Sequence, residues 1–460
     1  MKAADVNRIW ERIAGVILAS AVLVNLLLVF VVIPELTKGL RPLYNQESFQ
    51  DGYDLIAANL ADGHGYRFYP DTAETVMREP GYPVVLAGLR RVFGPGFEEV
   101  KIANVCFALM TAWILMYLGG KLVAPGKLAL LVPAFFLIHP GTVIAESRGG
   151  VEILFGALLT LFMLAVYKAI ETEKWSTYLL AGYVLGFTVL VRSTPIIFAA
   201  FLLVYVWVAE RRRTRLSKIC RNAGVMVMAM ISVLSPWIIR NYALTGRFIP
   251  TASVLGVSAQ AGQYICTNLT LHRRWVDLDR AAGKERERLA EAAGYRLRGG
   301  YYQVFYSTID EITFSNYLLS NVVERYREKP WLCLKCIAYN VVNLWCAGKT
   351  WSSTAISAGI QFPYLGFALA GVIIRIRERR FRSIGPIVLL IVYTVAVYAP
   401  ILAQARYSVP LVPFVSLLAS IGLVGVWRVS KRDTPISDGE SASWRIQQGT
   451  ATTTRGCAGA

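Results

Sequence analysis

Long apolar segments alternate with shorter polar ones along most of the chain. Each apolar segment is long enough, or nearly so, to cross a hydrocarbon core of about 30 Å as a helix. The pattern therefore predicts an all-α integral membrane protein with about ten transmembrane helices. The segments begin near Ile13, Ile102, Leu128, Ile153, Tyr178, Pro195, Ala223, Ala358, Ile384 and Val409.

The same pattern assigns the remaining residues to loops. Residues 34–99, a turn at 139–151 and the long segment 240–357 are predicted to share one side of the membrane. Within the long segment, residues 331–346 are also apolar, but a span there would reverse the side of every later loop. We therefore interpret 331–346 as an interfacial helix. The membrane domain is predicted to cover residues 1–430.

The basic residues orient this domain. The formal net charge is +18, and the basic side chains form blocks beside apolar segments, as at 211–215 and 375–380. Because positive loops stay in the cytoplasm, the pattern predicts a multi-pass membrane protein with residues 34–99 and 240–357 on the outer side. Residues 431–460, rich in Ser, Thr, Gly and Gln, are predicted to form a disordered cytoplasmic tail.

Composition narrows the class further. Apolar residues make up 55% of the chain and charged residues 17%, which excludes a string of soluble domains. Nucleic-acid binding is excluded because no polar, basic soluble face is available. The apolar run 13–33 is longer than a secretory signal and lacks its cleavage site, so we interpret it as an uncleaved first helix. The single CxxC, Cys333 and Cys336, has no second pair for zinc and is interpreted as buried thiols.

The first outer loop is dense in carboxylates and aromatic residues. Residues 51–66 read DGYDLIAANLADGHGY, and residues 78–83 read REPGYP. Apolar side chains from Tyr53 to Leu60 fall on one helical face, which predicts a short amphipathic helix with Asp51 at its start. The residues alone leave two interpretations of Asp51 open: a helix N-cap or a carboxylate directed into a site. His64, between two glycines, is interpreted as a turn residue rather than a metal ligand.

These fragments, in this order, resemble the first periplasmic loop of bacterial GT-C glycosyltransferases of the protein O-mannosyltransferase and aminoarabinose transferase group. The resemblance extends over roughly residues 10–430. Further matching fragments are EILF at 152–155, GFTVLVR at 186–192, PWIIRNY at 236–242 and RYSVPLVP at 406–413.

The resemblance implies a GT-C fold with periplasmic juxtamembrane helices. It also implies that a sugar moves from a polyprenyl-phosphate donor to an acceptor glycan, lipid or protein at the outer face of the inner membrane. By motif position, Asp51 is the catalytic residue. A carboxylate there can take the proton of the attacking acceptor, and a single displacement inverts the anomeric carbon, without the second carboxylate of retaining enzymes. Residues expected to support the site are Tyr53, Asp54, Tyr82 and Glu152.

The departing lipid phosphate gains negative charge, so cationic donors should stabilise the transition state. Four arginines lie at predicted outer ends of helices or loops, where the positive-inside rule would not place them. We predict that they bind the donor phosphate, with Arg240 and Arg406 the strongest candidates; the alternative is that they reach lipid head groups. The four are Arg78, Arg192, Arg240 and Arg406.

Other interpretations stay open. Arg148 and Glu152 either pair with each other or join the donor site. No cofactor is required by the motifs, no metal site is predicted, and a divalent cation is neither demanded nor excluded. Rival functions are a flippase or transporter of lipid-linked sugars, a polymerase or ligase of polyprenyl-linked glycans, and a non-catalytic partner subunit. Against transport, the chain shows no internal repeat.

Overall fold

The computed structural model describes residues 3–37, 51–123, 127–210, 215–269, 275–298, 304–348 and 350–432. Within these residues nearly all regular structure is helical, which confirms the predicted all-α class. The strands described are β1 (Leu297–Arg298) and β2 (Val304–Phe305), paired antiparallel. Three predicted segments lie wholly or partly outside the described residues: the tail 431–460, the first part of the loop 34–99 and most of the basic block 211–215.

Six helical segments of the described chain are long and apolar enough to cross a membrane. Each coincides with a segment predicted from the hydropathy pattern. The elements that contain them are α1 (Ala3–Leu27) with η1 (Leu28–Val32) and α2 (Ile33–Thr37), α5 (Glu98–Leu122), α8 (Val151–Thr172), α11 (Leu216–Thr245), α16 (Trp351–Arg377), and η6 (Ala405–Leu411) with α18 (Val412–Arg432).

The other four predicted segments are also helical, but they are bent or short. One is η3 (Lys127–Leu130) with α6 (Leu131–Leu137), which is followed by α7 (Pro140–Ser147) after a bend of 48°. Because the predicted spans differ in this way, the count of ten stays a prediction. The three shorter apolar helices are α9 (Trp175–Val191), η4 (Thr194–Ile196) with α10 (Phe198–Glu210), and α17 (Gly385–Tyr398), the last preceded by η5 (Phe381–Ser383).

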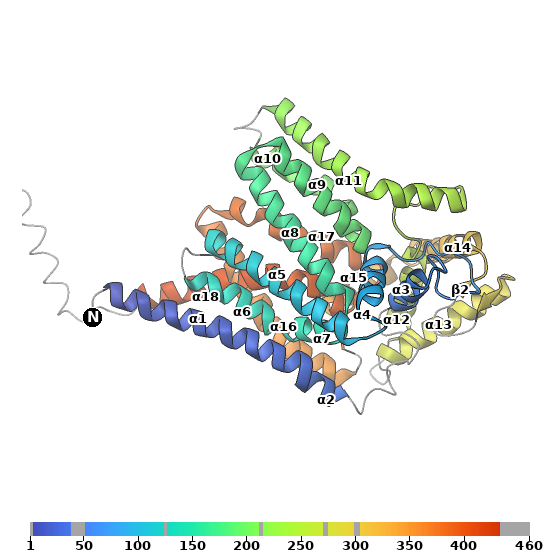
Figure 1. Ribbon diagram of the computed structural model, residues 1–460, viewed down its shortest axis with the longest axis horizontal. Coiled ribbons are helices and arrows are strands. Elements are labelled where there is room, and N and C mark those ends of the chain that lie inside the picture. Colours follow the sequence, from blue (N-terminus) through green and yellow to red (C-terminus); the bar gives the residue numbers. More distant parts are fainter. Residues whose placement is uncertain are drawn as a thin grey trace, which may run out of the picture.

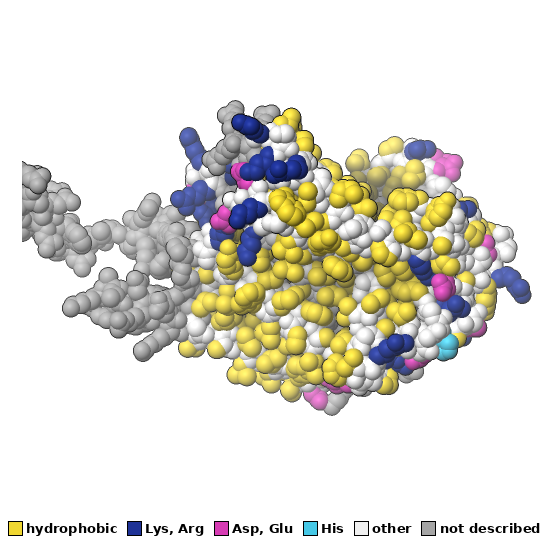
Figure 2. All heavy atoms as spheres, turned by 45° about the horizontal axis from the view of Figure 1, so that its top comes forward, with side chains coloured by type: hydrophobic (Ala, Val, Ile, Leu, Met, Phe, Trp, Pro, Cys, Tyr) yellow, Lys and Arg dark blue, Asp and Glu magenta, His cyan; other side chains and the backbone are white. Residues whose placement is uncertain are grey.

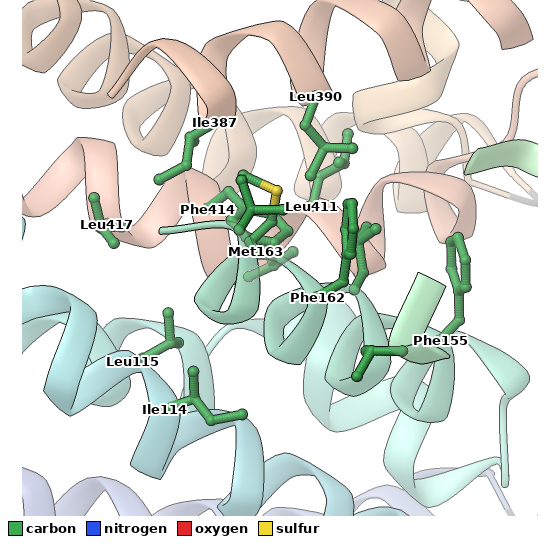
Figure 3. Close-up of a cluster of buried hydrophobic side chains, with 14 of the residues drawn as sticks. Ile114, Leu115, Phe155, Phe162, Met163, Ile387, Leu390, Leu411, Phe414 and Leu417 are labelled. Atoms are coloured by element: carbon green, nitrogen blue, oxygen red, sulfur yellow. The ribbon is translucent and has the colours of Figure 1, made fainter. Parts of the chain in front are cut away.

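Helix α8 lies at the centre of the bundle, and it packs against α5, α9 and η6. Figure 3 shows Phe162 and Met163 of α8 beside Leu411 and Phe414 from the C-terminal part of the chain. Lipid tails are as apolar as these side chains, so close packing rather than exclusion from water holds such helices together. Glycines contribute here: a Cβ at Gly422 of α18 would collide with the backbone of α16.

A layer of shorter helices covers one end of the bundle, on the right of Figure 1. One of them, α15 (Pro330–Cys346), contains the predicted interfacial segment 331–346. It is 17 residues long, and its interfacial position stays a prediction. The layer comprises α3 (Tyr53–Ala61), α4 (Gly81–Phe93), α12 (Leu255–Asn268), α13 (Trp275–Ala292), the β1–β2 hairpin, α14 (Thr308–Glu328) and α15 (Pro330–Cys346).

Apolar and charged side chains occupy different parts of the surface. In Figure 2 a broad field of hydrophobic side chains covers the middle of the molecule, and many lysine and arginine side chains gather at one end. Exposed apolar side chains such as Trp113, Phe187 and Val204 are found on the bundle helices. An apolar field of this extent is unusual on a soluble protein and is expected where helices face lipid.

Candidate active site

Asp51 lies immediately before α3 in an uncommon backbone conformation. Its φ is 56° and that of Gly52 is 81°, so two successive residues are left-handed. This conformation costs a non-glycine residue on the order of 1 kcal/mol or more. The N-cap of α3 is Gly52, and no side chain caps the helix. The capping interpretation of Asp51 is therefore wrong, and its carboxylate is engaged elsewhere.

The partner of Asp51 is Arg406, which lies 355 positions later, in η6. Arg406 Nη1 is 2.8 Å from Asp51 Oδ2, and Nη2 donates to Oδ1 at 3.2 Å. The ion-pair contact and the hydrogen bond engage both carboxylate oxygens, which fixes the orientation of the two side chains. The remaining Nε of Arg406 donates to Gln404 Oε1 at 2.9 Å. The ion pair thus joins the first outer loop to the start of the last helix.

Three arginines lower the pKa of the Asp51 carboxyl group. Burial would by itself raise the pKa of Asp51, but the guanidinium groups of Arg406, Arg78 and Arg192, with the hydrogen bond from Arg406, hold it below its ordinary value. Attraction by nearby positive charge favours the ionised carboxyl. Three of the four predicted arginines are therefore close enough to affect the predicted catalytic carboxylate.

Arg192 and Glu152 form a second, looser pair. Arg192 follows the end of α9, Glu152 lies in the first turn of α8, and both side chains are almost fully buried. The Nη1 to Oε1 distance is 3.9 Å, too long for a hydrogen bond. Among the described residues, neither of these two buried atoms has a hydrogen-bond partner. Such unmet capacity in a buried pair calls for an explanation, and a bound anion at Arg192 would supply one.

Tyr407 packs against two of these arginines. Its ring centroid is 4.6 Å from Cζ of Arg192 and 5.3 Å from Cζ of Arg406. Tyr398 stacks on Tyr407, with 4.9 Å between ring centroids. Aromatic faces hold cations in place by electrostatic attraction. Sequence reasoning missed both tyrosines; Tyr407 adjoins a predicted arginine, whereas nothing in the sequence pointed to Tyr398.

The segment around Arg78 reaches the same place because a glycine lets two helices touch. A Cβ at Gly81, the first residue of α4, would lie 2.7–2.8 Å from atoms of Leu190 and Val191 at the end of α9. The close approach lets Glu79 Oε1 accept a hydrogen bond from the backbone N–H of Ser193 at 3.0 Å. Glu79 is buried and was not predicted, although it lies within the REPGYP motif.

The predicted supporting residues form a wall beside the ion pair. The guanidinium of Arg78 lies over the Tyr53 ring at 5.5 Å, and Tyr53 meets Tyr82 edge to face at 5.6 Å. Tyr82 donates its hydroxyl to the carbonyl of Gly149. Asp54, in the first turn of α3, contributes to the electrostatic field at Tyr82. The structure thus brings Tyr53, Asp54 and Tyr82 into one group.

Arg240 lies in a different ion pair. Its Nη2 donates to Glu74 Oε2 at 3.0 Å, and its Nη1 donates to the carbonyl of Thr75 at 2.9 Å. The guanidinium also lies over Trp237, 4.6 Å from the ring centroid. These contacts fasten α11 to the first outer loop. The structure therefore places Arg240 apart from the Asp51 carboxylate, with its charge already paired.

An apolar crevice opens beside the tyrosine pair. Its wall runs from Tyr398 and Tyr407 to Leu390 of α17 and Leu159 of α8. The crevice has a volume of only about 10 Å³, so a lipid chain could enter only if its walls moved apart. A second groove, of about 550 Å³, is lined by residues of α13 and the hairpin such as Glu287 and Leu297.

Metal ligands are not gathered anywhere in the described residues. No group of three His, Cys, Asp or Glu side chains could hold an ion there. His64 is exposed, and its backbone N–H donates to Asn59 O at 2.8 Å in the turn after α3. This placement agrees with its interpretation as a turn residue.

Residues 78–239 match the family model described as dolichyl-phosphate-mannose-protein mannosyltransferase. No curated protein matches the chain. Among solved structures, the chain is similar to ArnT from Cupriavidus metallidurans, a crystal structure with bound undecaprenyl phosphate. The TM-score is 0.39 and the identity 11%, over 92% of this chain and 78% of that chain. Over residues 78–239, the family match supports the resemblance to membrane glycosyltransferases that the sequence shows.

Proposed function

We propose that this protein is an inverting glycosyltransferase that moves a sugar from a polyprenyl-phosphate donor to an acceptor at the outer face of the inner membrane. The observation that carries the proposal is the group around Asp51: one carboxylate acted on by three arginines at the boundary between the bundle and the outer layer. The matched family, described as using a dolichyl-phosphate sugar, supports the donor class.

Each charged group has a role in this reaction. The acceptor hydroxyl or amine attacks the anomeric carbon and loses its proton to the Asp51 carboxylate. The bond from that carbon to the lipid phosphate oxygen breaks, and the phosphate leaves with an added negative charge. Arg406, Arg78 and Arg192 stabilise that charge. A single displacement inverts the configuration at the anomeric carbon.

The ion pair between Asp51 and Arg406 adjusts the strength of the base. A carboxylate held by arginine is a weak base, because the positive charge lowers its pKa. A donor phosphate competes with Asp51 for Arg406. Once the phosphate binds, Asp51 loses part of this attraction and becomes more basic. Donor binding therefore prepares the base for the acceptor.

The lipid chain and the membrane orientation fit this arrangement. The crevice next to Tyr398 and Tyr407 is lined mainly by apolar side chains such as Leu159 and Leu390, and after opening it would receive the first isoprene units. Lys168, Lys174 and Lys218 lie near the C-terminal end of α8, just before α9 and near the start of α11. Figure 1 shows these helix ends on the side away from the outer layer. The positive-inside rule assigns that end to the cytoplasm and the site to the periplasm.

A transfer assay with a matched pair of carboxylate variants tests the proposal. Purified protein in nanodiscs receives radiolabelled polyprenyl-phosphate monosaccharides, one sugar at a time, with envelope extract as acceptor. Asp51→Asn should lose at least about 100-fold in transfer rate. Glu74→Gln removes a carboxylate from the other arginine pair and should retain activity within about tenfold.

Three results would contradict the proposal. Equal activity in wild type and Asp51→Asn would exclude Asp51 as the base. Movement of intact labelled donor across a vesicle membrane, without a new glycosidic bond, would favour a flippase. Transfer of whole lipid-linked glycans, but of no monosaccharide, would favour a polymerase or ligase.

A further inference from the structure

The only CxxC of the chain lies in the outer layer, and one of its thiols faces another helix. Cys333 and Cys336 are on α15, and Cys266 is on α12. Cys266 and Cys336 are 1% and 0% exposed, and both belong to one buried cluster with Leu332. Cys333, one turn earlier on α15, is only half-buried. The proposed function uses none of these thiols.

The two buried thiols lie in one contact cluster between two helices that pack against each other. Cys266 of α12 and Cys336 of α15 are close enough for each to affect the pKa of the other. Two thiols that the folded structure holds close together on different helices are the arrangement that a disulfide can link.

We propose that Cys266 and Cys336 form a disulfide bond that links α12 to α15 in the mature protein. The segment 240–357, which carries both residues, is predicted to face the periplasm, where disulfides form and persist. The inference goes beyond the proposed glycosyl transfer, and its test does not depend on activity.

The reaction needs a partner that accepts two electrons, and a protein disulfide is the class that does so by exchange. The thiolate of Cys336 attacks one sulfur of the partner, which gives a mixed disulfide and releases one partner thiol. The thiolate of Cys266 then attacks the sulfur of Cys336 and displaces the second partner thiol. One intrachain disulfide forms, and the partner disulfide is reduced to two thiols that take up the two protons. Both sulfurs are buried after folding, so the exchange precedes the closure of this layer.

The bond would reinforce the support of Arg406. On the α15 side, Asn340 donates to the carbonyl of Ala399 at 2.9 Å. On the α12 side, a Cβ at Gly262 would collide with the backbone of Ile401. Both helices of the pair therefore contact the 399–402 segment just before η6. A cross-link between them would fix the distance between the two contacts.

Differential thiol labelling of the full-length wild-type protein tests the inference directly. Membranes are quenched in acid, and free thiols are blocked with N-ethylmaleimide under denaturing conditions. The protein is then reduced, labelled with deuterated N-ethylmaleimide and digested for mass spectrometry. We expect the deuterated label on Cys266 and Cys336, and the first label on Cys333 and on the exposed Cys220. The first label on most copies of both Cys266 and Cys336 would overturn the inference.

Variants establish the pairing. Cys266→Ser should transfer Cys336 to the first label, whereas Cys346→Ser, which removes another buried thiol of α15, should leave the pair oxidised. Deuterated label on Cys333 in place of Cys336 would also contradict the assignment, because Cys333 would then be the partner.

Thermal unfolding gives an independent readout. Reductant should lower the Tm of the wild type by about 5 °C or more, because the bond closes a loop of about 70 residues. It should leave the Tm of a Cys266→Ser, Cys336→Ser double variant unchanged. An equal response of the two proteins would overturn the inference.

Discussion

Two carboxylate–arginine pairs join the first outer loop to helices of the bundle, and they have similar members but different surroundings. Asp51 pairs with Arg406, and Glu74 pairs with Arg240. Both arginines lie against aromatic rings, Arg406 beside Tyr407 and Arg240 beside Trp237. Arg240, however, also donates to a backbone carbonyl. The group around Arg406 instead includes a buried arginine nitrogen, on Arg192, that has no hydrogen-bond partner within the described part of the chain.

The difference separates a structural ion pair from a candidate site. A pair whose donors are satisfied by the fold itself holds chain segments together and has little left to offer a ligand. A group of arginines with unmet hydrogen-bonding capacity is suited to receive an additional anion. Position at the outer end of a helix, which the sequence shows, is shared by both arginines and cannot distinguish them. Four variants or measurements can break or sharpen this comparison.

The largest contrast should come from the arginines themselves. Arg406→Gln should lower the transfer rate by about 100- to 1000-fold, because it removes the cation closest to Asp51 and to the proposed phosphate. Arg240→Gln should lower the Tm and leave the rate per folded molecule within about tenfold. Steady-state kinetics and thermal unfolding of the two purified variants check both expectations. Equal kinetic losses would place Arg240 in the site.

A smaller effect on transfer kinetics is expected from changes at Tyr407, whose ring contacts both Arg192 and Arg406. Tyr407→Leu removes the aromatic face from Arg192 and Arg406, and a cation–π contact is worth about 1–2 kcal/mol when desolvated. The donor KM or the rate should therefore worsen by roughly 5- to 30-fold. Tyr407→Phe keeps the face and should stay near wild type. If Tyr407→Phe is equally impaired, the hydroxyl rather than the ring is important.

The acid limb of the pH profile should shift when the donor binds. The arginines hold the pKa of Asp51 below its ordinary value in the free protein, so kcat/KM for the donor should persist at pH values below the usual range of an aspartate. Phosphate binding weakens that attraction, so the acid limb of kcat should lie at higher pH. The two profiles are measured over the same pH series. Coincident limbs would show that the donor leaves the Asp51 pair intact.

Near the structural pair of Glu74 and Arg240, the carboxyl group of Glu311 should make the stability of the protein depend on pH. Burial raises the pKa of Glu311 to about 7, although Thr75, Val76 and Ser253 donate hydrogen bonds to it and Arg240 lies nearby. A raised pKa favours the protonated folded state, so this contribution is complete below about pH 4 and is lost as the pH rises through 7. Tm should fall modestly over that interval.

Glu311→Gln, which cannot ionise, should flatten this part of the Tm profile. The amide oxygen can still accept the hydrogen bond from Val76, so the variant is expected to fold. An unchanged slope in Glu311→Gln would assign the pH dependence to another group.

The helices of the bundle could be predicted from the sequence, because each membrane helix is a continuous run of apolar residues. All ten predicted segments fall on helices or on a bent pair of helices. The turn at 139–151 was predicted, but the helix α7 that the structure places within it was not, because hydropathy does not specify the backbone of a short connecting segment. Asp51, Arg78, Arg192 and Arg406 could be selected because each stands where a charge is unexpected or where a motif of a known family recurs.

Other features of the site depend on contacts between distant parts of the chain. The pairing of Arg240 with Glu74 joins residues 166 positions apart, and no local pattern records it. The bond from Ser193 to Glu79 exists because Gly81 admits the end of α9. The stacking of Tyr398 on Tyr407 likewise depends on how α17 and η6 meet. Such residues become identifiable only once the packing of the helices is known.

The 355 positions that separate Asp51 from Arg406 also set an order of events during synthesis. At ordinary translation rates of about 5–20 residues per second, Arg406 emerges roughly 20–70 s after Asp51. Throughout that interval a membrane-inserted nascent chain would carry the base without its principal cation. Under the proposed mechanism, transfer can therefore begin only after the last helix has been inserted. Chains whose synthesis stops early would remain inert towards the lipid-linked sugar pool.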